Sequence, residues 1–178
     1  MQIIKSAEET EDIARSVADN HGVYIVPAFV GMGAPYWDMA ARGVICGLTR
    51  GANRQHLVRA ALESIAYQVS DLFNSTTSDL PFSIKEMFVD GGACVNNFLM
   101  QFQADILDLP VNRPKNIETT ALGAGLLAGI GCGFWQSVAE LNNCRTVDKI
   151  FHPEMDNTQK GQLLQDWQIA VQKTITNS

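Results

Sequence analysis

A glycine pair between a short apolar run and an amphipathic segment constrains this chain more than any other feature of its sequence. Residues 86–89 include the run Met-Phe-Val, which is typical of a buried strand, and the run ends just before Gly91 and Gly92. A helix is expected next, with Asn96 or Asn97 as its N-cap. A strand, a turn without side chains and a helix N-terminus leave bare backbone and free N–H groups in one place. This order suits a nucleotide.

The spacing alone leaves a second explanation open. Many strand-to-helix turns carry two glycines simply to bend the chain. The helix itself is indicated more firmly, because Phe98, Phe102 and Ile106 recur every four residues and would share one face. The residues therefore predict the strand, turn and helix, while the reason for the glycines has two candidates.

The composition is that of a globular chain. Of 178 residues, 46% are hydrophobic and 18% are charged, which argues against disorder and allows one domain with a sizeable core. The net charge is −6, from 19 acidic and 13 basic residues, and the basic residues form no cluster. We therefore expect no nucleic acid and no membrane as a partner. The first residues lack the basic start and apolar core of a signal peptide, so we expect a cytoplasmic location.

The residues that most often bind metals are scattered along the sequence. No CxxC pair is present, and no histidine lies close to a cysteine. We predict reduced, mostly buried thiols rather than zinc ligands or disulfides, and we assign no metal site. The residues concerned are Cys46, Cys94, Cys132, Cys144, His21, His56 and His152.

Periodicity and turn residues predict an α/β fold with alternating helices and strands. The expected strands or extended pieces are 22–30, 44–46, 86–89, 109–115 and 147–151, with the prolines of 109–115 indicating an edge position or a strand end. The expected helices are 7–19, 53–74, 96–107, 121–135 and 137–143, followed by a last helix that starts at Asp156 or Asn157.

Two of these helices carry patterns that predict their packing. In the helix at 53–74, apolar residues recur every three or four positions, and we expect this stripe to face the core. Thr119 or Thr120 would cap the helix at 121–135. Each of its three glycines destabilises the helix by about 0.5–1 kcal/mol relative to Ala. We expect another backbone to approach these glycines closely, because such packing would offset that cost. The stripe is Leu62, Ile65, Val69 and Leu72, and the glycines are Gly123, Gly125 and Gly129.

Four stretches resemble the glycerol kinase branch of the FGGY carbohydrate kinases. They are GAPYWD at 33–38, the family's second signature at 43–63, VDGGACVNN at 89–97 and ETTALGAG at 118–125. Within the second signature, the residues that match are Gly43, Gly47, His56, Leu57, Ala60 and Glu63. The resemblance runs from about Gln2 to Trp167, which is nearly the whole chain.

The resemblance implies a partial actin-like ATPase (ribonuclease H-like) domain, in which residues 1–178 form the C-terminal FGGY domain without its first strands. It implies that Gly92 lies against the adenosine part of ATP or ADP, that Asn96 hydrogen-bonds near the base, and that Gly91 only makes the turn. The family's reaction transfers the ATP γ-phosphoryl group to glycerol, with Mg²⁺ on the nucleotide. The helix at 121–135 would pack on the nucleotide domain's sheet.

Several catalytic parts of the family have no counterpart in this sequence. The first phosphate loop and the aspartate base are absent, and Asp38 and Asp90 do not match the base. We therefore assign no catalytic residue and expect Asp38 to form a local ion pair with Arg42. The chain alone is expected to be inactive, with a nucleotide affinity no better than about millimolar, because several phosphate contacts are lost.

An incomplete sheet would leave the strand at 86–89 with an open edge, so we expect a homo-oligomer or another segment to cover it. Two alternatives to glycerol kinase stay open. The first is another FGGY sugar kinase, such as a pentulose kinase, although GAPYWD favours glycerol. The second is a non-catalytic interaction module. In some bacterial relatives a glutamate near the last helix shares a zinc with a transport regulator, but Gln159 at the matching position is a weak ligand.

Overall fold

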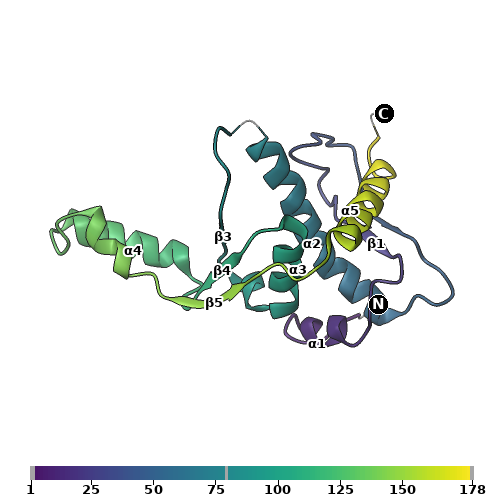
Figure 1. Ribbon diagram of the computed structural model, residues 1–178, viewed down its shortest axis with the longest axis horizontal. Helices are drawn as coiled ribbons and strands as arrows, with labels where there is room; N and C mark the ends of the chain where they lie inside the picture. Colours follow the sequence, from purple (N-terminus) through teal and green to yellow (C-terminus); the bar gives the residue numbers. More distant parts are fainter. Residues whose placement is uncertain (1–2, 79, 177–178) are drawn as a thin grey trace.

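The computed structural model describes residues 3–78 and 80–176, and it shows a helical body from which one arm extends (Figure 1). The arm holds α4 and the segment that returns to β5. The helices are α1 (Thr10–Arg15), α2 (Arg54–Thr77), α3 (Asn97–Leu107), α4 (Thr119–Gly131) and α5 (Asn157–Gln172), with short 3-10 helices η1 (Gly92–Val95) and η2 (Val138–Asn143). The strands are β1 (Tyr24–Val26), β2 (Val44–Cys46), β3 (Met87–Phe88), β4 (Val111–Pro114) and β5 (Val147–Phe151).

The strands form two small sheets. β1 and β2 pair antiparallel, and a separate sheet has the order β3-β4-β5. β3 runs parallel to β4, with Met87 opposite Val111, and β5 runs antiparallel to β4. β4 is thus the middle strand and not an edge. Its prolines lie at its ends, since Pro110 precedes the strand and Pro114 closes it, so the alternative of a strand end is confirmed.

α2 is the long helix that the sequence predicts, but its buried face is not the predicted one. Asn53 caps it, because the side chain of Asn53 accepts hydrogen bonds from the backbone of Gln55 and His56. The expected core stripe lies on the opposite, more open side: Ile65 and Leu72 are 41% and 48% exposed. The buried face instead combines small and polar residues with one valine and one tyrosine. They are Val58, Ala60, Glu63, Ser64, Ala66, Tyr67, Ser70 and Asp71.

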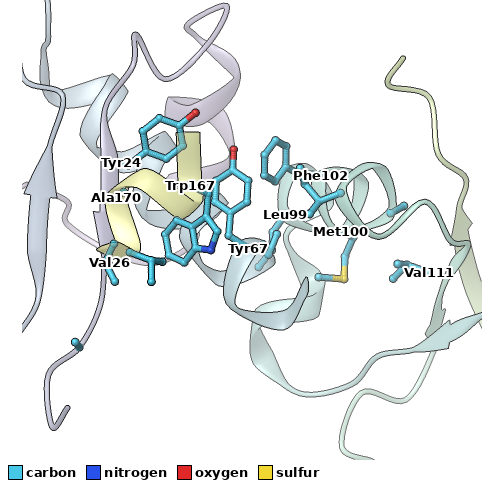
Figure 2. Close-up of a cluster of buried hydrophobic side chains, with 14 of the residues drawn as sticks. Tyr24, Val26, Tyr67, Leu99, Met100, Phe102, Val111, Trp167 and Ala170 are labelled. Carbon is cyan, nitrogen blue, oxygen red and sulfur yellow. The ribbon is translucent and has the colours of Figure 1, made fainter. Parts of the chain in front are cut away.

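The core gathers around Tyr67 of α2 (Figure 2). Its ring stacks on Trp167 of α5, with 5.0 Å between the ring centroids, and meets Phe102 of α3 edge-on at 5.4 Å. Three helices that are distant in sequence therefore share one aromatic cluster. The last helix begins as predicted, with Asp156 as its N-cap, and its apolar face points into this core.

Two buried carboxylates tie the body together. Glu63 of α2 accepts from Arg59 at 2.7 Å and from Asn20 at 2.8 Å, while burial raises its pKa. Asp71 accepts from the indole nitrogen of Trp167 at 2.7 Å and from the hydroxyl group of Tyr36 at 2.8 Å. Both side chains are hydrogen-bonded from several directions, as buried charges require.

The predicted ion pair between Asp38 and Arg42 is wrong. Asp38 is buried and accepts from the backbone and hydroxyl of Thr176 at 2.6 and 2.8 Å, contacts that lower the pKa of the Asp38 carboxyl to about 2. The Arg42 guanidinium donates to three backbone carbonyls, the nearest being that of Ala41 at 2.8 Å. The Asp38 carboxylate instead binds Thr176, which lies 138 residues further along the chain. The local sequence does not predict this long-range contact.

At Gly123 and Gly125 of α4 the expected close approach of another backbone is not found among the described residues, and at Gly129 the near neighbour is the Trp135 ring. None of the residues of α4 is buried, and Figure 1 shows this helix projecting away from the other helices. Outside the backbone of the helix itself, a Cβ added at Gly123 or Gly125 would meet no described atom within 4 Å. Neither threonine caps it, because Glu118 occupies the N-cap position without a side-chain hydrogen bond. The surface on which such an apolar helix would pack is not supplied by the described residues.

Smaller differences concern α1 and the cysteines. α1 spans six residues, about half of the predicted helix. All four cysteines are free, but only Cys94 is buried, while Cys132 is exposed. The expectation of mostly buried thiols is therefore wrong. Among the described helices, none combines the length and the apolar character that crossing a membrane requires.

Candidate nucleotide site

The two adjacent glycines have different backbone conformations and different roles. Gly91 has φ 77° and ψ 175°, a conformation that side chains disfavour, and its N–H donates to the carbonyl of Ile117 at 2.9 Å. It therefore makes the turn after β3. η1 begins at Gly92, so one 3-10 turn separates Gly91 from the start of α3.

Gly92 has neither of the usual internal reasons to be glycine. Its φ lies outside the left-handed range, and a Cβ built on it meets no described atom within 4 Å. The turn explanation thus accounts for Gly91 but not for Gly92. A bare backbone that faces open space leaves room for a ligand to approach closely.

Asn96 is the predicted N-cap of α3. Its side-chain oxygen accepts from the backbone N–H of Leu99 at 3.0 Å, and its amide nitrogen donates to the hydroxyl of Thr10 at 3.2 Å. An amide has two donor hydrogens and two acceptor lone pairs, so one of each is left over. Asn96 is therefore fixed in orientation by α1 and α3 and still has hydrogen-bonding capacity.

Glu11 of α1 holds the neighbouring residue of the same helix start. Its carboxylate accepts from the backbone N–H of Asn97 at 2.7 Å and from the Asn97 amide at 3.2 Å. Partial burial alone would raise the pKa of Glu11, but the hydrogen bonds from Asn97 and the contact with Arg15 lower it overall. A carboxylate at a helix N-terminus is also favoured by the helix dipole.

These residues border one cavity of about 570 Å³. Its walls come from the N-terminal segment, α1, α2 and the region from η1 to the start of α3, and they are mainly apolar. The lining residues are Ile4, Ala7, Glu8, Thr10, Glu11, Leu62, Ile65, Gly92, Ala93, Val95, Asn96 and Leu99. The structure therefore brings both predicted site residues, Gly92 and Asn96, to the same hollow.

The charge of the lining limits what this cavity can hold. Glu8 and Glu11 are its only charged residues among those described, and both are acidic. The nearby Arg113 is engaged, since it pairs with Asp148 at 2.7 Å and donates to the carbonyl of Cys94 at 2.9 Å. An apolar, uncharged ring with hydrogen-bonding edges fits these walls, whereas a phosphate group does not.

Sequence reasoning missed the far wall of the cavity. Thr10 and Glu11 lie 86 residues from their hydrogen-bond partners Asn96 and Asn97. Leu62 and Ile65 were expected in the core. No local pattern marks such contacts, because they depend on how α1 and α2 pack on the start of α3.

The other residues considered for chemistry lie in structural roles. Asp90 accepts a hydrogen bond from the hydroxyl of Thr119, which links the turn to the start of α4. His56 accepts from the backbone N–H of Asn53 at 3.2 Å and stacks on His21. In the described part of the chain, no group of three or more His, Cys, Asp or Glu side chains is placed to hold a metal ion.

Comparison with known proteins decides the family. Residues 2–132 match the model of the C-terminal domain of the FGGY family of carbohydrate kinases. The chain belongs to this family. A glycerol kinase of Shewanella baltica is 58% identical over 172 residues, and one of Alkaliphilus oremlandii is 54% identical over 175. These matches cover 97% and 98% of this chain but 35% of each relative, so the chain spans about a third of their length.

Solved structures agree with the family assignment. Plasmodium falciparum glycerol kinase, crystallised with ADP, superposes with a TM-score of 0.88 at 35% identity, over 99% of this chain and 35% of that one. A xylulose kinase of Lactobacillus acidophilus superposes with a TM-score of 0.79 at 22% identity, which shows the shared fold alone. The predicted FGGY fold, with its actin-like ATPase architecture, is thereby confirmed for the C-terminal part.

Proposed function

We propose that this chain is the nucleotide-binding, C-terminal part of a glycerol kinase, which transfers the γ-phosphoryl group of ATP to glycerol. Identity of 54–58% to glycerol kinases over nearly the whole chain carries the choice of substrate. The cavity beside Gly92 carries the assignment of this part to the nucleotide.

The adenosine part of ATP or ADP is the group that fits the cavity. The open backbone at Gly92 lets a flat ring or a ribose lie close, and Leu62 and Ile65 offer apolar contact. The remaining donor and acceptor of Asn96 would bind the edge of the base. The chain's own residues would thus bind and orient the nucleoside.

The phosphates and the Mg²⁺ ion need other ligands. The cavity offers no basic side chain, and its two carboxylates, Glu8 and Glu11, repel phosphate. The described residues present no cluster of metal ligands. Bound Mg²⁺ would neutralise phosphate charge, but none of the described residues is assigned to it. We therefore expect no glycerol phosphorylation by these residues alone.

A pentulose kinase is the second candidate within the family. Xylulose kinases share the fold at 22% identity, far below the identity to glycerol kinases. The loop at 33–38 is packed against the body through Tyr36 and Asp38 and does not border the cavity beside Gly92. A substrate panel of glycerol and pentuloses, run on the longest natural form of the protein, would separate the two.

The assembly and the location are also part of this proposal. We expect a homo-oligomer, because large apolar side chains such as Leu127 and Phe134 are exposed. Light scattering on the purified protein measures this. We expect a cytoplasmic location, where ATP is abundant and the four free thiols stay reduced.

Titration of the chain with ADP, followed by NMR, tests the site. We expect weak binding, near millimolar, that shifts the backbone signals of Gly92 and Asn96, because the phosphates gain no cation. Replacing Gly92 with valine should abolish it. We expect the fold to stay intact, since nothing described lies within 4 Å of a Cβ added at Gly92.

Gly161→Val is the matched control. Gly161 lies on α5, and a Cβ added there also meets no described atom within 4 Å outside the backbone of its own helix, but Gly161 does not line the cavity. We expect unchanged ADP shifts in this variant. If the Gly92→Val protein bound ADP as well as the unsubstituted protein, the site would be refuted. Micromolar affinity for ADP would contradict the inference that these residues offer no ligands for the phosphates.

A further inference from the structure

Arg113 of β4 binds the backbone immediately before Asn96. Its Nη1 donates to the carbonyl of Cys94 at 2.9 Å and to the carbonyl of Val95 at 3.2 Å. These are the last two residues of η1, and the last carbonyls of a helical turn have no partner inside that turn. Arg113 therefore caps the turn that runs from Gly92 to the start of α3.

The carbonyl of Val95 is linked directly to the conformation of Asn96. It belongs to the peptide unit that joins Val95 to Asn96, and this unit is planar. A guanidinium that holds the carbonyl therefore also restricts the backbone rotation that aims the Asn96 side chain. Val95 and Asn96 both line the cavity beside Gly92, whereas Arg113 does not. Arg113 thus acts on the cavity wall through the backbone.

The guanidinium of Arg113 is itself held in place by β5. Its Nε and Nη2 lie 2.8 and 2.7 Å from Oδ2 of Asp148, and it lies over the ring of Phe151, 5.3 Å from the centroid. Only 12% of the Arg113 side chain is exposed. Because a guanidinium is planar and its donors are arranged as a fixed fork, these contacts leave it little freedom. The end of η1 is therefore fixed relative to β4 and β5.

We propose that Arg113 is a positioning residue for nucleotide binding, which holds Asn96 in the orientation that lets its amide bind the edge of a purine base. This inference rests on the proposed function of the cavity. Arg113 adds no contact with the nucleotide. Its loss frees the peptide unit before Asn96 to rotate, so that the remaining donor and acceptor of the amide are aimed less accurately and the nucleotide binds more weakly.

A double-mutant cycle tests whether Arg113 acts through Asn96. The variants are Arg113→Met, Asn96→Ser and their combination, because methionine cannot donate and serine still caps α3 but lacks the amide. We expect each single variant to weaken ADP binding about threefold or more, as followed by NMR titration. The double variant should bind like Asn96→Ser alone. Additive losses would overturn the proposal, since they would show that Arg113 acts independently of the Asn96 amide.

Arg42→Met is the matched control. The guanidinium of Arg42 also donates to backbone carbonyls, the nearest being that of Ala41 at 2.8 Å, but neither residue lines the cavity. We expect unchanged ADP affinity in this variant. Equal weakening in the Arg42→Met and Arg113→Met proteins would overturn the proposal, because the loss would then reflect a general loosening of the chain.

A measurement without nucleotide separates this inference from the proposed function. The backbone N–H of Leu99 donates to the Asn96 side chain at 3.0 Å. In Arg113→Met without ADP, this amide should exchange with deuterium about threefold or more faster than in the unsubstituted chain. Unchanged exchange would overturn the proposal even if ADP binds. Faster exchange, in a chain whose unsubstituted form shows no ADP-induced shifts, would refute the nucleotide site but not the hold of Arg113 on Asn96.

Arg113→Lys replaces the methionine variant if that protein does not fold. Lysine keeps the positive charge, but it lacks the planar fork that binds two carbonyls and Asp148 at once. We expect losses in the same direction, with weaker ADP binding and faster exchange at Leu99. Full retention of both by the lysine variant would show that charge alone suffices, which would overturn the positioning role.

Discussion

α3 and α4 both follow strands of the same sheet and are both rich in apolar residues, yet their surroundings are opposite. Nine of the 11 residues of α3 are buried, whereas none of the 13 residues of α4 is. α3 packs against α2 and also contacts α5, while α4 projects into the arm (Figure 1). Apolar composition shows that a helix needs a partner surface, but it does not show whether this chain provides one.

The difference also appears at the helix starts. α3 has a side-chain cap from Asn96 and a carboxylate from Glu11 at its N-terminus. α4 begins after Glu118 without a side-chain cap. In this chain α3 is therefore stabilised by its termini and its sides, whereas α4 is held mainly by its own backbone hydrogen bonds.

The largest expected effect is the difference between truncating a leucine in α3 and truncating one in α4. Leu99 of α3 is 1% exposed and Leu127 of α4 is 70% exposed. Leu99→Ala should lower the free energy of unfolding by about 2–5 kcal/mol, because it removes buried contacts and leaves a cavity. Leu127→Ala should change it by less than about 0.5 kcal/mol. Urea unfolding measures both, and similar losses would mean that α4 is packed in solution.

A smaller effect is expected from the glycines of α4. Gly125→Ala should stabilise the helix by about 0.5–1 kcal/mol, since no described atom lies near the added Cβ. Hydrogen exchange of the α4 amides should slow several-fold. Gly129→Ala is the control, because its Cβ would lie 2.2 Å from the Trp135 ring and that ring would have to move. Slower exchange in the control alone would contradict the open surroundings of Gly125.

The smallest expected effect is a change in how stability depends on pH, caused by Glu11 at the start of α3. The pKa of Glu11 is lower in the folded chain than its ordinary value of 4.5, so its stabilising contribution is present above that value. As the pH falls through the folded pKa, the carboxylate is protonated and the contribution is lost. Glu11→Gln should therefore show a flatter decline of the urea midpoint between pH 7 and pH 3. Parallel declines in both proteins would remove Glu11 from the stabilisation of α3.

The sequence predicts the elements well where the signal is local. Asn53, Asn96 and Asp156 cap helices as expected, and the strand at 147–151 has the predicted bounds. These features depend on one side chain and its own helix, or on a short run between turns. The same holds for Gly91, whose positive φ agrees with its predicted role in the turn.

Local patterns did not predict which face of α2 is buried. Its regular stripe at Ile65 and Leu72 is open, while Ser64 and Asp71 are buried. Asp71 is buried because Trp167 and Tyr36, distant in sequence, bring donors to it. The cavity has the same origin, since Gly92 and Asn96 were predicted as site residues but the walls from α1 and α2 were not.

The hydrogen bonds of Asp71 affect when the body can fold during synthesis. Asp71 leaves the ribosome 96 residues before Trp167, the donor of its shortest hydrogen bond. Until α5 emerges, water must hydrate that carboxylate, and Tyr67 lacks the ring on which it stacks. The nascent body therefore stays unsealed until α5 has left the ribosome, which makes α5 the element that commits the body to its compact form.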